Sequence, residues 1–382
     1  MSTSGCLLRT PYCVTHEVAA NYKLERGQYN VSTTAEEFPG ATPGKPVGGW
    51  YGWNSFLNRK IASRRCGIYT SEPFDASKTP VLFVHGLVSD PYTWSRTIKC
   101  LTKDPQITSN FQFWFYAYPT STPLLNSGAV FREHFHSFVR DIEKEHRISL
   151  QSKVILAGHS LGGILCKTLV SDSDDILWNK AFQCPIDDLK LEQSERELLR
   201  KSFFFEPSPY VSRVCFFAPP HRGSRLAESG IGRLGMKIVN VPGFIADLDK
   251  NLKRRENLSR VRPGFREYFG NPLSSVASLQ PSAPVTRLVA ELPVDPDTPF
   301  HTIVGRKDES EAGDGIVSIK SSRLAGAISE IVVNSGHNVH QSRDAARIFA
   351  YLLKCHIGLI SEDKAHREIR KIKGVGLARS LG

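Results

Sequence analysis

The sequence predicts an α/β fold built on a mostly parallel central sheet that helices cover on both faces. Three observations support this prediction. Short runs of strand length are apolar throughout, segments with helical spacing alternate with them, and 40% of the 382 residues are hydrophobic, enough for a sizeable core. Strands that are apolar on both faces are typical of a parallel sheet that is buried on both sides.

The first half of the chain contains three candidate strands and one helix. The segment GIYTSEPF, which begins at Gly67, is expected to form an edge strand that ends at Pro73. The runs PVLFVHG at 80–86 and FQFWFYAYP at 111–119 are expected to form buried strands. Apolar residues at helical spacing predict a helix over 129–146, with Ser127 as its N-cap.

The second half repeats this alternation. KVILAG at 153–158 is expected to form a strand, and a helix should run from Leu161 to about Ser171. By the same reasoning, the remaining predicted elements are strands over 211–218, 299–305 and 329–334 and a helix over 342–354.

Two stretches, at about 172–210 and 222–298, are charged, contain proline and are too long for ordinary connections. We therefore expect them to be insertions above the sheet of a domain spanning residues 67–355. Residues 1–66 would form an N-terminal extension of unassigned role, and residues 356–382 a basic C-terminal tail whose last part, KIKGVGLARSLG at 371–382, is expected to be frayed. Apolar groups at 201–210 and 231–248 would either form the inner face of a lid or pack the insertions onto the core.

The chain is basic, with 49 Lys and Arg against 38 Asp and Glu, and residues 250–266 and 354–382 carry much of the surplus. These segments are either a solvated surface or a contact with an anionic membrane or a phosphate-bearing ligand. No zinc-like spacing of Cys and His occurs, and aromatic and basic residues do not interleave, so we expect no nucleic-acid partner. The sequence gives no indication of oligomeric state.

Eight cysteines lie at no repeated interval, which favours a reduced, cytoplasmic chain or one peripheral to a membrane. No apolar run approaches the roughly 18 residues that a membrane-spanning helix requires. The opening MSTSGC resembles the end of a bacterial lipoprotein signal, although no apolar region precedes it. An exported lipoprotein with Cys6 as lipidation site is the alternative if the natural start lies upstream.

The motif GHSLG at 158–162 places a serine between glycines at the point where a strand is expected to turn into a helix. Such a turn exposes the hydroxyl and directs the first amides of the helix towards negative charge that develops nearby. Gly158 and Gly162 fit because the turn leaves no room for side chains. Ser160 is therefore a candidate nucleophile, which would need a base to remove its proton. His159 is expected to support this turn.

Five segments together carry a family resemblance: FVHGL, GHSLGG, APPHRGS, DGIVS and SGHNVHQS. Over roughly 67–355 they resemble the α/β-hydrolase superfamily, and within it lipase- and esterase-type serine hydrolases similar to bacterial triacylglycerol lipases and inositol-deacylase-like lipases. The resemblance implies a Ser–Asp–His triad in that chain order, an oxyanion hole of two backbone amides, and no metal or other cofactor.

Carried onto this sequence, the resemblance makes Asp314 the acid, with Asp308 as the alternate. It makes His337 the base, with His340 as the alternate three residues later. The backbone N–H groups of Leu161 and Leu87 would form the oxyanion hole. The loop that presents Leu87 would be shaped by His85 and Gly86.

The expected activity is hydrolysis of carboxylic esters, with lipids or long-chain acyl esters as substrates. An acyltransferase or thioesterase on the same scaffold is an alternative, because the same triad serves those reactions. A third possibility is a catalytically silent binding protein that keeps the fold.

Overall fold

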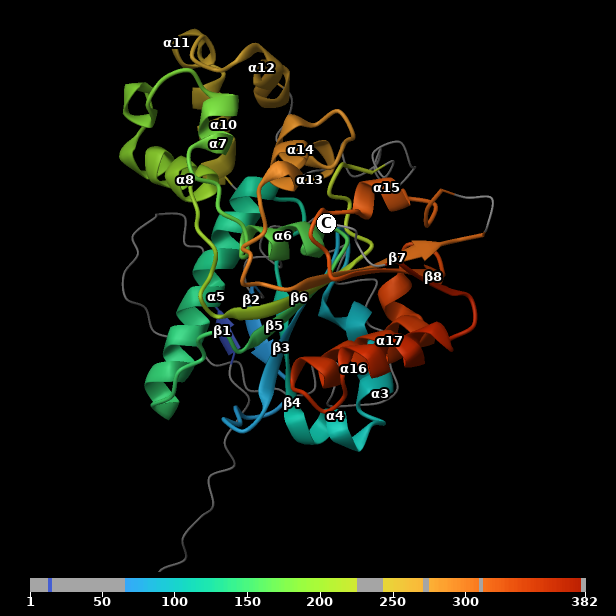
Figure 1. Ribbon diagram of the computed structural model, residues 1–382. Coiled ribbons are helices and arrows are strands. Elements are labelled where there is room, and N and C mark those ends of the chain that lie inside the picture. The colour runs from blue at the N-terminus through green and yellow to red at the C-terminus, as the bar shows by residue number, and fades with distance from the viewer. Residues whose placement is uncertain (1–12, 16–65, 225–242, 271–274, 309–311, 379–382) are drawn as a thin grey trace, which may run out of the picture.

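The computed structural model describes residues 13–15, 66–224, 243–270, 275–308 and 312–378. Within them, one sheet has the strand order β1-β2-β4-β3-β5-β6-β7-β8-β9 (Figure 1). The six strands from β4 to β8 in this order are parallel, whereas β1, β2 and β9 pair antiparallel. The strands are β1 (Cys13–Thr15), β2 (Gly67–Thr70), β3 (Thr79–Val84), β4 (Phe111–Ala117), β5 (Val154–His159), β6 (Val211–Phe217), β7 (Phe300–Arg306), β8 (Ser329–Asn334) and β9 (Val375–Ala378).

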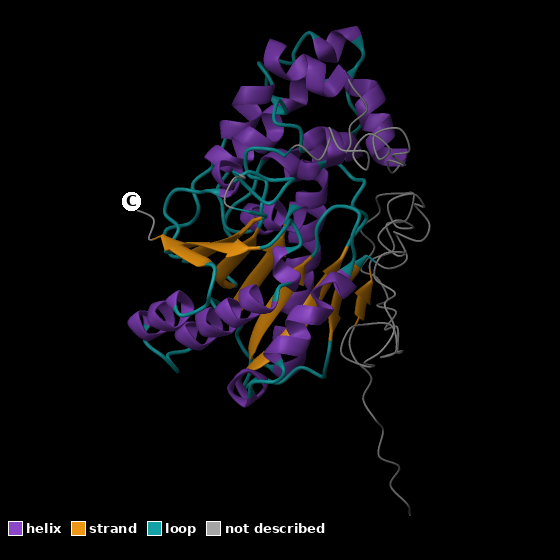
Figure 2. Cartoon of the chain, turned by 90° about the vertical axis from the view of Figure 1, so that its right-hand side faces the viewer, coloured by secondary structure: helices purple, strands orange, loops and turns teal. Residues whose placement is uncertain are grey.

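Helices cover both faces of the sheet (Figure 2), which confirms the predicted fold class. One face carries α3 (Ser95–Leu101), α4 (Pro105–Asn110), α16 (Arg343–His356) and α17 (Glu362–Arg370), and the other carries α5 (Leu124–His146) and α6 (Leu161–Thr168). Strand β3 shows why its run is apolar throughout. Val81 and Phe83 belong to the core on the first face, while Leu82 and Val84 belong to the core on the second.

The described parts of the two predicted insertions form a helical cap on one side of the sheet, at the top of Figure 1. Its helices are α7 (Ile176–Ala181), η3 (Ile186–Asp188), α8 (Gln193–Phe203), α10 (Gly243–Leu252), α11 (Arg255–Leu258), α12 (Pro263–Gly270), α13 (Ser275–Ser278) and α14 (Pro284–Glu291). Phe203 and Phe205 are buried in the core cluster that also contains Leu82 of β3. At 201–210 these two rings therefore pack the cap onto the sheet. Most of the 231–248 segment lies outside the described residues.

Four local predictions were wrong. Helix α5 begins at Leu124 with Pro123 as its N-cap, and Ser127 lies inside the first turn, where its hydroxyl donates to the carbonyl of Thr122 at 3.1 Å. Helix α6 ends at Thr168, because Ser171 instead forms a β-bridge with Val294. Strand β2 is not at the edge, since β1 pairs beyond it.

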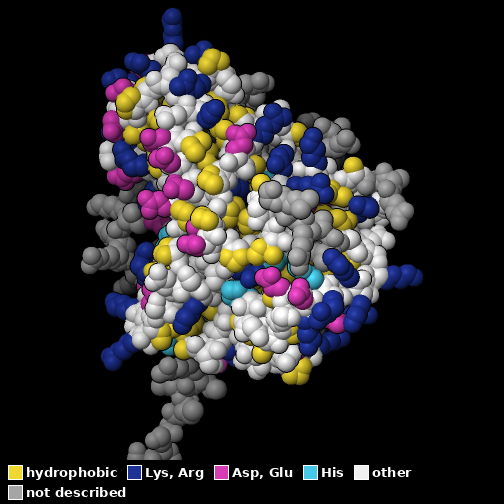
Figure 3. Space-filling model, viewed as in Figure 1, with side chains coloured by type: hydrophobic (Ala, Val, Ile, Leu, Met, Phe, Trp, Pro, Cys, Tyr) yellow, Lys and Arg dark blue, Asp and Glu magenta, His cyan; other side chains and the backbone are white. Residues whose placement is uncertain are grey.

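The fourth error concerns the segment from residue 371, which is not frayed in its described part up to residue 378. Helix α17 packs Ala365 and Ile369 into the core, and β9 adds an antiparallel strand to β8. The basic side chains of α17 lie on its outer side. Figure 3 shows Lys and Arg side chains over both the cap and the region of α16 and α17, so both basic segments contribute to the surface. Their contact with an anionic membrane stays a prediction.

Candidate active site

Ser160 lies at the turn between β5 and α6 in a backbone conformation that residues with side chains rarely adopt, with φ 54° and ψ −122°. Its own N–H donates to the carbonyl of Phe217 in β6 at 2.9 Å, which ties the turn to the neighbouring strand. A strained residue that surrounding contacts hold in place is a common feature of functional sites.

The glycines of the motif are required by close backbone contacts. A β-carbon on Gly158 would lie 2.7 Å from the carbonyl oxygen of Gly162. A β-carbon on Gly162 would collide with the carbonyl oxygens of Val84 and His85 at the end of β3. The turn therefore presses directly against the segment that leads to Leu87.

His337 follows β8 and reaches the serine. Its Nε2 atom lies 3.0 Å from Oγ of Ser160, and its Nδ1 atom lies 2.8 Å from Oδ2 of Asp314. Asp314 lies in the loop after β7. Because a carboxylate oxygen can only accept, Nδ1 of His337 carries the proton and donates it to Asp314. In the neutral ring, the lone pair of Nε2 then faces the serine hydroxyl.

The Asp314 carboxylate is held in place by its own loop. Its Oδ1 atom accepts the N–H groups of Ile316 and Val317 at 2.8 and 2.7 Å, and its side chain is 2% exposed. Gly315 has φ 90°, a conformation that suits glycine. These bonds leave Oδ2 directed at His337.

Gly305 in β7 was not singled out from the sequence, yet it lets two of these loops meet. A β-carbon there would lie 2.6 Å from the carbonyl oxygen of Ser335, 2.7 Å from that of Gly336 and 3.0 Å from Cβ of Asp314. A glycine near the end of a buried strand is a signal of close backbone approach, so the sequence did contain a clue.

The segment after β3 lies against the serine turn. Burial lowers the pKa of His85 to about 4, and its ring stacks on Tyr118 with ring centroids 4.4 Å apart. The Tyr118 hydroxyl donates to the His85 carbonyl at 2.8 Å. The residue after Leu87, Val88, has φ 51° and donates its N–H to Oγ1 of Thr120 at 3.1 Å. The loop is therefore fixed on both sides of Leu87.

Leu161 is the first residue of α6. Its N–H therefore has no carbonyl partner within the helix. The two amides proposed from the sequence, of Leu161 and Leu87, thus belong to two segments that meet where a β-carbon on Gly86 would lie 3.0 Å from Cβ of Ser160.

Neither alternate residue is in a position to replace Asp314 or His337. Asp308 is exposed, and the carboxylate that contacts His337 is that of Asp314. His340 is fully buried, and its Nε2 atom lies 2.7 Å from Oγ1 of Thr93. The structure thus brings together Ser160, Asp314 and His337.

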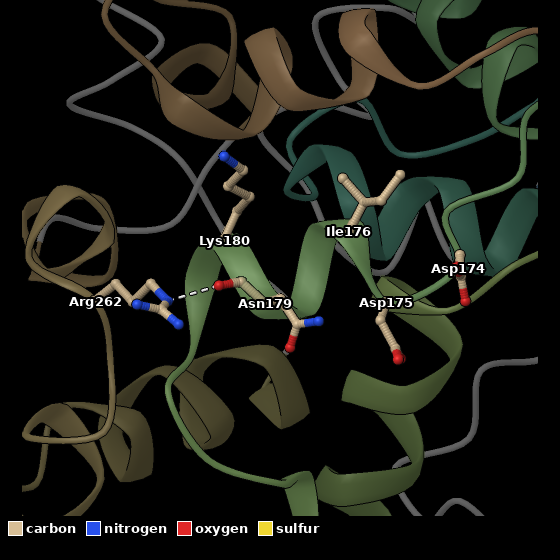
Figure 4. A pocket seen from close by; sticks show the side chains of 6 residues that line it. All are labelled: Asp174, Asp175, Ile176, Asn179, Lys180 and Arg262. Carbon is tan, nitrogen blue, oxygen red and sulfur yellow. Dashed lines mark hydrogen bonds between the residues drawn. The ribbon is translucent and has the colours of Figure 1, made fainter.

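A hollow of about 760 Å³ on the cap is lined by Asp174, Asp175, Ile176, Asn179, Lys180 and Arg262. Figure 4 shows that these side chains point in different directions. The Nε atom of Arg262 donates to the backbone carbonyls of Asn179 and Phe182, at 2.6 and 3.2 Å. This hollow does not contain Ser160 and offers no convergent set of polar groups.

Within the described residues, no cluster of three or more His, Cys, Asp or Glu side chains could hold a metal ion. No helix in the described part of the chain is both long and apolar enough to cross a membrane. Six cysteines in that part are free thiols, whereas Cys6 lies outside it.

Many solved structures resemble this chain, among them those of the following three proteins. The mature lipase BlEst2 from Bacillus licheniformis is 17% identical, with TM-score 0.41, and 75% of this chain and 97% of that chain are covered. This chain covers 53% of the propeptide form of the same lipase. The esterase EaEST from Exiguobacterium antarcticum is 14% identical, with TM-score 0.35 and coverages of 76% and 95%. Phospholipase PlaB from Legionella pneumophila is 13% identical, with TM-score 0.41 and coverages of 77% and 63%.

A search of curated protein sequences finds no significant match. The sequence model of the alpha/beta hydrolase family, by contrast, matches residues 81–350 and confirms the resemblance that the motifs indicated. This match spans the serine turn, the Asp314 loop and the His337 loop. Because it covers more than half of the 382 residues, the chain belongs to the alpha/beta hydrolase family.

Proposed function

We propose that the protein is a serine hydrolase that cleaves carboxylic esters, with Ser160 as nucleophile, His337 as general base and Asp314 as the acid that orients it. The single observation that carries this proposal is the continuous pair of contacts from Oγ of Ser160 to His337 at 3.0 Å and on to Asp314 at 2.8 Å. Three separate loops contribute these residues, and their contacts match the arrangement of nucleophile, base and orienting acid that serine catalysis requires.

The reaction follows from the proton positions. His337 Nε2 takes the hydroxyl proton as Oγ of Ser160 attacks the ester carbonyl, and Asp314 stabilises the resulting imidazolium. The N–H groups of Leu87 and Leu161 donate to the oxyanion of the tetrahedral intermediate. Each donor lowers the activation free energy by about 3–4 kcal/mol. His337 then protonates the leaving alcohol. Water attacks the acyl-enzyme by the same steps in reverse.

We place the substrate among lipids or other long-chain esters. Leu87 is only partly buried and packs against the core cluster that continues into the cap through residues such as Leu279 and Val285. Apolar side chains next to the amide that would hold the oxyanion suit an apolar acyl chain.

A fluorophosphonate probe and a series of p-nitrophenyl esters of increasing acyl length test this proposal. We expect the probe to label Ser160 in the native protein and not in Ser160→Ala, and we expect longer acyl chains to be cleaved with higher kcat/KM. Native protein that stays unlabelled would contradict the serine mechanism. A sharp preference for acetyl and butyryl esters would contradict the substrate class, and preferential transfer to an added alcohol or thiol would identify an acyltransferase.

A further inference from the structure

Three histidine rings lie together behind Ser160. The ring centroids of His159 and His337 are 5.1 Å apart, and those of His159 and His340 are 3.8 Å apart. His159 directly precedes Ser160 in the turn, whereas His337 and His340 belong to the loop after β8. The Ser160 hydroxyl contacts His337 and not His159 or His340. The proposed mechanism therefore gives His159 and His340 no role.

His159 forms one hydrogen bond to the backbone of His337. Its Nε2 atom lies 3.0 Å from the carbonyl oxygen of His337. A carbonyl can only accept, so Nε2 of His159 carries the proton and donates. Nδ1 of His159 is buried and has no hydrogen-bond partner among the described residues. The turn is thus joined to the His337 loop twice, through the Ser160 hydroxyl and through this backbone contact.

The His159 ring has little freedom to move. On one side it packs on His340, whose Nε2 atom lies 2.7 Å from Oγ1 of Thr93 and whose ring contacts Trp94 edge-on at 4.8 Å. On the other side lies Gly86, where a β-carbon would stand 3.0 Å from Nδ1 of His159. The ring is therefore fixed between the segment after β3 and the loop after β8.

Burial also keeps this group neutral. It lowers the pKa of His159 well below the ordinary value for histidine, with His340, His337 and His85 as the neighbouring rings that lower it further. Burial lowers the pKa of His340 to about 3. A neutral donor can hold the His337 carbonyl without placing a second positive charge next to the imidazolium that forms on His337 during turnover.

We propose that His159 is a positioning residue, which sets the distance between His337 and Ser160 by donating its Nε2 proton to the backbone carbonyl of His337. This inference rests on the proposed serine hydrolase function and extends it to a residue that touches neither substrate nor the reacting atoms. Displacing the catalytic base by about 1 Å lowers the reaction rate on the order of 100-fold. Loss of this one hydrogen bond should therefore have a measurable effect on kcat.

Two substitutions separate the hydrogen bond from the ring contact. His159→Gln keeps an N–H donor at a similar reach but removes the aromatic ring, whereas His159→Phe keeps the ring and removes the donor. We expect His159→Phe to lower kcat by about 10- to 100-fold with KM within about twofold. We expect His159→Gln to keep kcat within about fivefold. The matched control is His136→Leu. It removes a half-buried histidine of α5 whose Nε2 atom lies 2.9 Å from Oγ of Ser208, and it should leave kcat unchanged.

The opposite order, with His159→Phe active and His159→Gln inactive, would overturn the proposal, because the ring contact alone would then matter. Losses that follow the fall in Tm equally in both variants would also overturn it. Ser160→Ala is assayed in parallel. If Ser160→Ala keeps its turnover, the proposed function itself fails, whereas an inactive Ser160→Ala beside a fully active His159→Phe removes only the role of His159.

The wild-type protein provides a measurement that does not depend on how the variants fold. Ring ¹⁵N chemical shifts of His159 should indicate a protonated Nε2 and an unprotonated Nδ1 throughout about pH 6 to 8. The Nδ1-protonated tautomer, or a titration within that interval, would overturn the proposal.

Discussion

Ser160 and His337 are 177 positions apart in the chain, yet Oγ of the serine lies 3.0 Å from Nε2 of the histidine. The parallel sheet makes this approach possible. Strand β5 leads into Ser160, β7 leads into the Asp314 loop and β8 leads into the His337 loop, and in parallel strands these ends meet at one edge of the sheet.

Asp314→Asn should lower kcat by about 10³- to 10⁴-fold with a small change in KM, because the amide favours the wrong tautomer of His337. Steady-state kinetics with a p-nitrophenyl ester measures this change. Asp308→Asn is the matched control on the same loop and should keep wild-type kinetics. A large loss in Asp308→Asn and none in Asp314→Asn would assign the acid to the other aspartate.

Gly305→Ala should reduce both stability and activity. The added methyl group would press on the carbonyls of Ser335 and Gly336 and move the loop that carries His337. We expect the free energy of unfolding to fall by about 1–3 kcal/mol. Chemical denaturation and kcat measure the two effects. The control is Gly264→Ala, where nothing lies within 4 Å of the added atom, so stability and kcat should stay at or above the wild-type values. Unchanged activity in Gly305→Ala would show that the close approach of the loops is dispensable.

Lys167 should make stability depend on pH. Its buried ammonium group donates to the carbonyl of Leu292 at 2.6 Å and to Oγ of Ser171 at 3.1 Å, and burial lowers its pKa from 10.5 to about 7. Between these two values the unfolded chain binds more protons than the folded one, so raising the pH stabilises the fold.

Comparison of wild type with Lys167→Met isolates this effect. The difference in the free energy of unfolding, wild type minus variant, should rise by about 1 kcal/mol per pH unit between about pH 8 and 9. Urea denaturation at several pH values measures it. The exposed Lys153→Met is the control and should show no such slope. A flat difference for Lys167→Met would mean that the folded state does not depress this pKa.

Truncation after Gly358 should destabilise the domain, because it removes α17 and β9 and exposes the edge of β8. The buried side chains of Ile369 and Ile372 alone suggest a loss of about 3 kcal/mol or more. Thermal unfolding and light scattering measure stability and aggregation. A chain that ends at Ala378 is the control, and equal Tm values for the two truncations would restore residue 355 as the end of the folded domain.

The sequence predicted the strands and the helices that are strongly apolar or periodic, because local burial patterns decide those elements. It predicted the position of Ser160 at a strand-to-helix turn for a similar reason, since the tight turn requires the nearby glycines Gly158 and Gly162. The sequence does not predict β9, because the segment VGLA is only four residues long and contains a glycine, and only pairing with β8 makes it a strand. The start of α5 is harder to predict, because Ser127 resembles an N-cap. In the structure Ser127 lies inside the helix, and its hydroxyl donates to the carbonyl of Thr122 just before the helix.

Contacts between distant segments were beyond the reach of sequence patterns. His159 was expected to support the turn, but its bond to the carbonyl of His337 depends on a backbone atom 178 positions away. The residues alone do not decide between Asp314 and Asp308. The bonds from Ile316 and Val317 that hold Asp314 exist only once the loop is folded.

The most direct test is mass spectrometry of the native protein after reaction with a fluorophosphonate, together with ester turnover by Ser160→Ala. We expect one adduct per chain on the peptide that contains Ser160, and an about 10⁴-fold or greater loss of kcat in the variant. Ester turnover by Ser160→Ala at the wild-type rate, or an adduct on a different residue, would contradict the account.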